Sequence, residues 1–170
     1  MGVREQLKEK PAIGFAVTAA FVLIAVLVLA RTYWPEEQAD LSRAFYTIDD
    51  GQTWFTDSAT KVAPFDYNGK TAVVAHVYNY ANGSKEFCAY LAKFTPEAKT
   101  KLEAAITDAA RAGKPPESVS LYGDRSFMSN GVLVKPAGPG GEWVPYGDPK
   151  AKPLFAVRAP DGSVVDQVFP

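Results

Sequence analysis

The stretch TAVVAHVYNYANGSKEFCAYLAKF, residues 71–94, carries the strongest fold signal in this sequence. Its first part, Thr71–Tyr80, is rich in Val, Ala and Tyr on both faces, which predicts a central strand. Asn82-Gly83 is a strong tight-turn signal, and Glu86–Phe94 follows as a partner strand. We therefore expect a long antiparallel hairpin in the middle of a sheet.

The segment after this hairpin predicts a helix over residues 95–112. Thr95 is a suitable N-cap, Pro96 fits the first helical position, and Gly113 ends the pattern after Arg111. Apolar residues at three- and four-residue spacing give the helix one apolar face that can cover a sheet. They are Ala98, Leu102, Ala105, Ile106 and Ala109. The expected class is α+β, with an antiparallel sheet of hairpins and one covering helix.

A second hairpin is predicted upstream, near residues 45–56. Residues 45–48 read as a strand, 49–52 as a turn and 53–55 as the returning strand. In this turn the Asp49 carboxylate can accept backbone amides, Gly51 can adopt a positive φ, and Trp54 can anchor the hairpin in the core.

The octapeptide TIDDGQTW, residues 47–54, resembles the Asp-box, or BNR motif. The residues at the defined positions of the motif are Thr47, Asp49, Gly51, Thr53 and Trp54. Asp-boxes recur in sialidase-like and other β-propellers, and occur singly in unrelated folds, where they are structural turns away from active sites. A single copy in a short domain excludes a propeller. The resemblance therefore implies a structural turn, with a carbohydrate-related role as the alternative.

A longer segment, residues 45–80, is similar to a group of small, uncharacterised, membrane-anchored bacterial proteins. The shared features are Phe-Tyr, Asp-Asp-Gly and Thr-Trp-Phe, followed by Pro-Phe-Asp and Gly-Lys. This resemblance implies a membrane-anchored architecture in a bacterial cell envelope, and it implies no activity.

The C-terminal part of the chain predicts further strands. They are a short strand at 119–122 before an irregular segment at 123–130, a hairpin of 131–136 with 142–146, and a final hairpin of 154–158 with 163–169. The glycine-rich loop at 137–141 lacks the Lys-Ser/Thr pair and the following helix of a phosphate-binding loop.

The N-terminal part predicts a membrane anchor. Residues 11–30, PAIGFAVTAAFVLIAVLVLA, carry no charge and are long enough to cross a hydrocarbon core of about 30 Å. Lys and Arg are denser before this run than after it, and Tyr33 and Trp34 mark its outer edge. The expected organisation is a cytoplasmic N-terminus (1–10), a transmembrane helix (11–34), a linker (35–43) and an extracytoplasmic β-rich domain (44–170).

Three alternatives concern this anchor. A cleaved signal peptide would fit the basic start and the Val-Leu-Ala ending at 28–30. A pilin-like subunit would fit Gly14-Phe15, but residues 16–20 lack the carboxylate of that family. The third alternative is association with another helix through three alanines at four-residue spacing. The competing interpretation is that these alanines simply face lipid. They are Ala12, Ala16 and Ala20.

Composition excludes several functional classes. The formal net charge is −1 with no basic cluster, so a nucleic-acid partner is not expected. With one cysteine and one histidine, the chain has no intrachain disulfide and no ordinary Cys/His zinc site. We expect Cys88 to be a core residue and His76 a satisfied strand residue. No metal and no cofactor are predicted.

The motifs point away from catalysis. There is no hydrolase elbow, nucleotide fingerprint or redox cysteine pair, and turn chemistry explains the paired carboxylates at 49–50 and at 57 with 66. We therefore expect a non-catalytic interaction module that docks another membrane or envelope protein. A glycan-binding domain that uses aromatic stacking is the alternative. The candidate contact residues, for which core anchoring is the competing interpretation, are Tyr122, Phe127, Trp143 and Tyr146.

Overall fold

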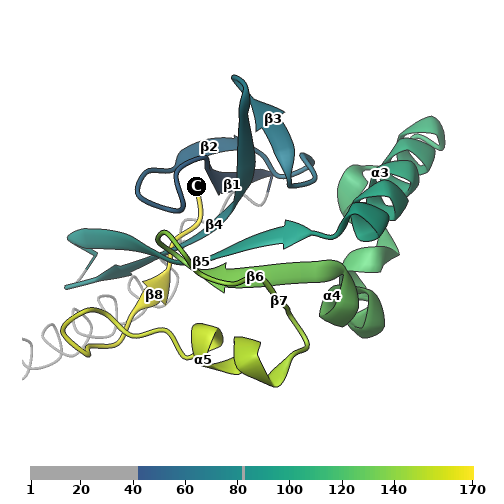
Figure 1. The fold of residues 1–170 in the computed structure, drawn as a ribbon. Coiled ribbons are helices and arrows are strands. Elements are labelled where there is room, and N and C mark those ends of the chain that lie inside the picture. Colours follow the sequence, from purple (N-terminus) through teal and green to yellow (C-terminus); the bar gives the residue numbers. More distant parts are fainter. Residues whose placement is uncertain (1–41, 82) are drawn as a thin grey trace, which may run out of the picture. The chain divides into compact units, whose positions relative to one another are not determined.

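An antiparallel sheet forms the centre of the computed structural model, which describes residues 42–81 and 83–170 (Figure 1). The strands are β1 (Arg43–Thr47), β2 (Phe55–Ser58), β3 (Phe65–Tyr67), β4 (Lys70–Tyr80), β5 (Lys85–Phe94), β6 (Val132–Pro136), β7 (Val144–Pro145) and β8 (Asp166–Gln167). Their order is β2-β1-β4-β5-β6-β7, with β3 and β8 also paired to β4. The helical segments are α3 (Pro96–Arg111), η1 (Pro116–Ser118), η2 (Ser120–Gly123), α4 (Arg125–Gly131), η3 (Pro149–Ala151) and α5 (Lys152–Phe155). The described chain is thus an α+β fold.

Strand β4 organises the sheet, as its length and its two apolar faces predict. It pairs with β5 from Val74↔Ala92 to Tyr80↔Lys85, with an irregularity between His76 and Val77. It also pairs with β1, β3 and β8, so four strands meet on β4. The expected central hairpin is confirmed.

Strand β3 was not predicted from the sequence. It forms a tight hairpin with β4 in which Tyr67 lies opposite Lys70. Asn68 and Gly69 occupy this turn with φ of 54° and 78°. An Asn-Gly pair with positive φ at both positions is a strong hairpin signal, so the missed strand was recognisable from sequence.

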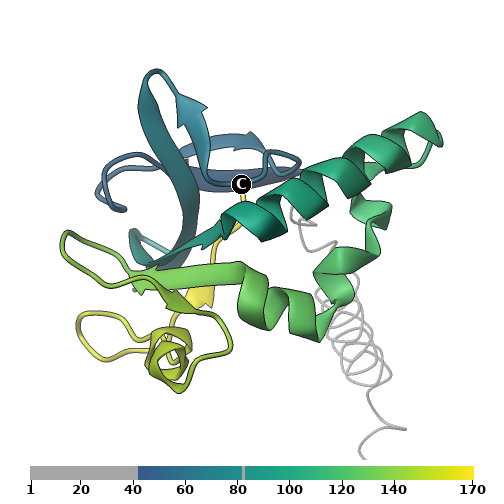
Figure 2. The same cartoon turned by 45° about the vertical axis from the view of Figure 1, so that its right-hand side comes forward.

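The predicted helix is present as α3, and its N-cap is confirmed because the Thr95 hydroxyl accepts the Ala98 amide at 3.2 Å. The helix does not cover the sheet, which corrects the expectation. It continues outward from the end of β5, as Figures 1 and 2 both show. Its apolar face is buried instead against segments outside the strands, since Leu102 packs in a cluster with Val62 and Val119.

Three other C-terminal expectations are wrong, and local capping explains two of them. A strand at 119–122 and an irregular segment at 123–130 were predicted, but residues 120–123 form η2 and residues 125–131 form α4. The Asp124 carboxylate caps α4 by accepting the amides of Ser126 and Phe127. The final hairpin is absent from the described residues. Residues 152–155 are helical, following the Asp148 cap of η3, and β8 pairs instead with β4. The 131–146 hairpin is confirmed, with Val134 opposite Val144.

The sheet separates two apolar clusters, which lie on opposite faces because successive residues of a strand point to opposite sides. Face A carries Tyr90, Ala92, Val132 and Val134, packed against Ala151 and the partly buried Met128, Leu154 and Val157. Face B carries Val73, Ala75, Val77 and Leu91, packed against the partly buried Trp54, Cys88 and Trp143. The C-terminal segments, and not α3, therefore complete the core on face A.

The chain divides into two units, Met1–Gln38 and Ala39–Pro170. Within residues 42–81 and 83–170, no helix has the length and apolarity needed to span a membrane. The predictions for 1–10, 11–34 and nearly all of 35–43 lie outside the described residues. The same holds for Ala12, Ala16 and Ala20.

Candidate functional site

A pocket of about 350 Å³ opens on face A. Strands β4, β5 and β6 supply its apolar floor, which includes Val74, His76, Tyr90, Ala92, Val132 and Val134. Tyr46 of β1, Lys61 and Met128 of α4 lie at its sides, and Tyr146 also lines it. Its volume is at the small end of the range of about 300–1,000 Å³ that proteins use for small molecules.

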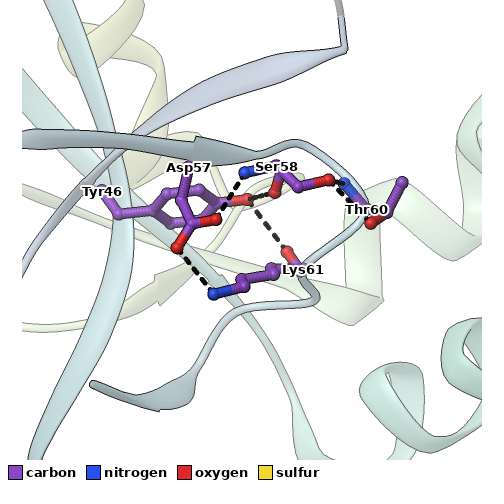
Figure 3. A network of polar contacts seen from close by, with 5 residues as sticks. All are labelled: Tyr46, Asp57, Ser58, Thr60 and Lys61. Carbon is purple, nitrogen blue, oxygen red and sulfur yellow. Dashed lines mark hydrogen bonds and ion pairs between the residues drawn. The ribbon is translucent and has the colours of Figure 1, made fainter. Parts of the chain in front are cut away.

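Along one side of the pocket, polar groups form hydrogen bonds and an ion pair with one another (Figure 3). The buried Tyr46 hydroxyl donates to the carbonyl oxygens of Ser58 and Lys61, at 2.9 and 3.0 Å. The Lys61 ammonium pairs with the Asp57 carboxylate at 2.6 Å, and this hydrogen bond lowers the pKa of Asp57. The polar groups on this side are therefore already engaged by the protein.

Aromatic rings form a continuous series from the pocket floor to the surface. The imidazole of His76 stacks on Tyr90, with ring centroids 4.2 Å apart and planes 15° from parallel. Tyr90 meets Phe155 edge-on at 5.6 Å, and Phe155 packs against Tyr146 at 4.8 Å. The last two rings are 36% and 43% exposed, respectively.

The titratable groups of the floor are neutral near pH 7. Burial lowers the pKa of His76 to about 4, and burial, with Tyr78 nearby, raises the pKa of Tyr90. The Nδ1 atom of His76 lies 3.5 Å from the Gln167 amide nitrogen, a long contact. Burial also raises the pKa of the half-buried Cys88 thiol, on face B, to about 11, so this thiol is protonated. Such an arrangement suits binding better than proton transfer or nucleophilic attack.

Face B carries the loop between β1 and β2, which we call the Asp49 loop (residues 47–54). One oxygen of the Asp49 carboxylate accepts the Thr47 hydroxyl at 2.8 Å and the Thr53 amide at 2.9 Å, and the other accepts the Thr53 hydroxyl at 2.6 Å. The Gly51 amide donates to the Thr47 hydroxyl oxygen at 3.0 Å. Burial acts to raise the pKa of Asp49, but the hydrogen bonds from Thr53 and Thr47 outweigh it and the pKa is lowered.

Contacts with residues distant in sequence hold the Asp49 loop against the sheet. Gly51 has φ of +86°, and a Cβ at this position would lie 2.9 Å from the Cys88 sulfur. The carbonyl of Asp50 accepts the Gly138 amide at 2.7 Å, and its carboxylate forms an ion pair with the buried Lys135. Together with the partly buried Trp54, these contacts close face B.

The predicted contact aromatics do not form one surface in the described structure. Phe127 is half-buried in α4 and lies 6.2 Å from Phe94. Trp143 packs on face B, with the Lys93 ammonium 4.3 Å from its ring centroid. Tyr146 is exposed beside the pocket, whereas Tyr122 lies in η2 and its side chain falls outside the description.

Sequence reasoning missed the pocket residues. Val74 and His76 are two positions apart in one strand, as are Tyr90 and Ala92 in the next, so each pair lies on one face of the sheet. This period-two pattern was available in the sequence. The place of Phe155 in the aromatic series could not be foreseen, because residues 154–158 were predicted as a strand, whereas Phe155 ends the helix α5. Within the described residues, no group of three or more His, Cys, Asp or Glu side chains could hold a metal ion.

Comparison with known proteins adds no identification. No protein-family model, no curated protein and no solved structure matches this chain.

Proposed function

We propose that this protein is a membrane-tethered, non-catalytic interaction module of a bacterial cell envelope. In this proposal residues 11–34 cross the bilayer, the N-terminus is cytoplasmic, and the domain from residue 44 docks another membrane or envelope protein outside the cytoplasm. The uncharged run of twenty residues at 11–30 and the basic residues before it support the anchor and its orientation.

The observation that carries the docking proposal is the exposed aromatic pair Tyr146 and Phe155. Each ring packs on the other at 4.8 Å, yet the residues stay 43% and 36% exposed. Aromatic side chains are enriched in the contact regions of protein interfaces, where they supply large apolar area with few rotatable bonds. The protonated thiol of Cys88 and the neutral, stacked His76 support a non-catalytic role.

Glycan binding, the alternative, has less support from the geometry. Sugar recognition needs polar groups that are available for hydrogen bonding, whereas the Tyr46 hydroxyl and the Lys61 ammonium are engaged within the protein. One face of Trp143, the other ring suited to stacking, is approached by Lys93.

Site-specific crosslinking in intact cells tests the docking proposal. A photoreactive amino acid replaces Tyr146 or Phe155 in the full chain, and replaces the 78% exposed Val164 as a matched control. We expect discrete adducts of the same mass from positions 146 and 155 and none from 164. The absence of adducts at 146 and 155, or an identical pattern at 164, would contradict docking through the aromatic pair.

Protease protection tests the proposed topology separately. External protease added to intact spheroplasts should remove the domain after residue 44 and leave a tag at the N-terminus protected. Protection of the domain and digestion of the tag would reverse the orientation.

A further inference from the structure

The pocket on face A has the size and lining of a small-molecule site. Its volume of about 350 Å³ exceeds that of a packing defect between side chains, and its floor comes from three adjacent strands. A floor built on strands keeps its geometry better than one built on loops. The space suits a compact molecule of one or two fused rings.

The charges around the pocket exclude a charged ligand. Among the described residues, no Asp or Glu side chain lines it, and the two lysines that do are engaged elsewhere. Lys61 pairs with Asp57, and the Lys93 ammonium lies over the Trp143 ring on the opposite face. A charged ligand would lose its hydration without gaining an unpaired counter-charge, which is unfavourable in an apolar site.

The His76 imidazole supplies the pocket with a flat ring face and with one polar atom. Its ring stacks nearly parallel on Tyr90, and both residues line the pocket. The only hydrogen bond of its ring within the described chain is the 3.5 Å contact of Nδ1 with Gln167. The Gln167 amide nitrogen can only donate, so Nδ1 accepts and the single proton of the neutral imidazole lies on Nε2. Nε2 has no protein partner within the described residues, so its N–H group can donate to a ligand.

From these three features we infer that the pocket binds a compact, uncharged aromatic molecule that carries one hydrogen-bond acceptor directed at the Nε2–H group of His76. The aromatic ring of the ligand lies against the His76–Tyr90 wall, and the remaining contacts are apolar, with Val74, Ala92 and Val134. This site is additional to the docking function and does not depend on it.

Quinoline is a suitable probe, because it is uncharged at pH 7, has two fused rings and has one hydrogen-bond acceptor. The full chain is reconstituted in lipid nanodiscs with isotope-labelled histidine, and the imidazole signal is followed as quinoline is added. Since the chain contains one histidine, the spectrum reports on His76 alone. We expect a shift of this signal that saturates. A shift that only rises in proportion to quinoline, as partitioning into lipid would give, overturns the inference.

Matched ligands test the predicted chemistry. Naphthalene, which has the same two fused rings but no acceptor, should bind at least threefold more weakly than quinoline, as expected for one lost hydrogen bond. Quinoline-3-carboxylate, which is charged, should bind at least tenfold more weakly. Equal affinity for quinoline and quinoline-3-carboxylate would show that the pocket does not select against charge, and would overturn the inference.

Two filling variants test the location. Val74→Phe fills the floor and should weaken quinoline binding at least tenfold, whereas Val164→Phe, at a position 78% exposed, should leave it unchanged. Ala59→Phe fills the pocket from the half-buried segment after β2 and provides the same test if Val74→Phe does not fold. Unchanged binding in a folded filling variant places the quinoline elsewhere and overturns the inference.

Discussion

The two faces of the sheet are closed in different ways. On face B the Asp49 loop lies against the sheet, held by the Asp50–Lys135 ion pair, by the close approach of Gly51 to Cys88, and by Trp54. On face A the C-terminal segments bury Ala151 completely but leave a pocket of about 350 Å³. On face B, polar contacts between distant segments add to the packing of Trp54, whereas on face A the C-terminal segments leave part of the face open.

This difference separates stability from binding. Truncation on face B removes contacts that hold distant segments together, so it should lower the free energy of unfolding. Truncation of exposed side chains on face A should affect binding and have little effect on stability. The following measurements on the full chain in detergent test this division.

The largest effect should come from Trp54 on face B. Trp54→Ala removes a large aromatic side chain packed against the face B cluster, and should lower the free energy of unfolding by about 4 kcal/mol. Tyr146→Ala is the matched control on face A, and should cost less than about 1 kcal/mol because Tyr146 is 43% exposed. Chemical denaturation measures both. If the Trp54 variant unfolds like the parent, the Asp49 loop does not close the core, and a binding role for Asp49 and Trp54 becomes the better explanation.

Acidification should act on face A through His76. Burial depresses its pKa from 6.5 to about 4, so above pH 6.5 the residue is neutral in both states and stability is complete. As the pH falls below 6.5 the unfolded chain takes up the proton first, and stability declines until about pH 4 by about 3 kcal/mol.

The variant His76→Gln is the control for this pH dependence. Its stability should be nearly constant between pH 6.5 and 4, apart from the contribution of the carboxylates. The pKa values of Asp49, Asp57 and Asp161 are lowered from the ordinary value of 3.8, so the stability that these carboxylates contribute is lost mainly below that pH. Parallel curves for the parent and the variant would contradict burial of a neutral imidazole.

Gly51 should show a smaller effect that is specific to its contact with the sheet. Gly51→Ala combines a φ of +86° with a Cβ placed 2.9 Å from the Cys88 sulfur and 3.2 Å from Cβ of Ala137, and should cost about 2–3 kcal/mol. Gly69→Ala has φ of +78° but no atom within 4 Å, and should cost only about 1 kcal/mol. Equal losses at the two positions would mean that the contact with Cys88 contributes nothing.

The smallest effect should come from the Asp49 carboxylate, which is only half-buried. Asp49→Ala removes the acceptor of two hydrogen bonds from Thr53 and one from Thr47, and should lower the melting temperature by the equivalent of about 1–2 kcal/mol. Asp161→Ala removes the exposed turn contacts with Ser163, among them the hydrogen bond from its amide, and should cost less than about 0.5 kcal/mol. Similar melting temperatures for both variants would contradict a structural role of the Asp49 network.

Sequence reasoning succeeded where the signal was local. The Thr95 cap, the β4–β5 hairpin and the hairpin that contains the Asp49 loop all depend on residues close together in the chain. It failed where a local signal was overlooked, as with the Asn68-Gly69 turn of β3 and the Asp124 cap of α4. These two elements were predictable, because the residues that form the turn and the cap are adjacent in the sequence.

Other features were not predictable from local sequence. Whether α3 covers the sheet or extends beyond it depends on the path of the chain after β5, and not on the apolar face of the helix. The pairing of β8 with β4 joins Asn79 to Asp166, and it competed with a hairpin that the Pro-Asp-Gly signal at 160–162 favoured. The tertiary pairing prevailed because an edge of β4 was available beyond β1.

The sequence by itself determined the α+β class, the central hairpin and the chemistry of the Asp49 loop, because each depends on side-chain periodicity or on hydrogen bonds spanning a few residues. Only the tertiary structure decided that Asp50 meets Lys135, 85 positions away, and that His76 and Tyr90 share a pocket. The physical reason is that contacts between distant segments depend on how the strands pair and on which segments cover each face, and no local pattern encodes either.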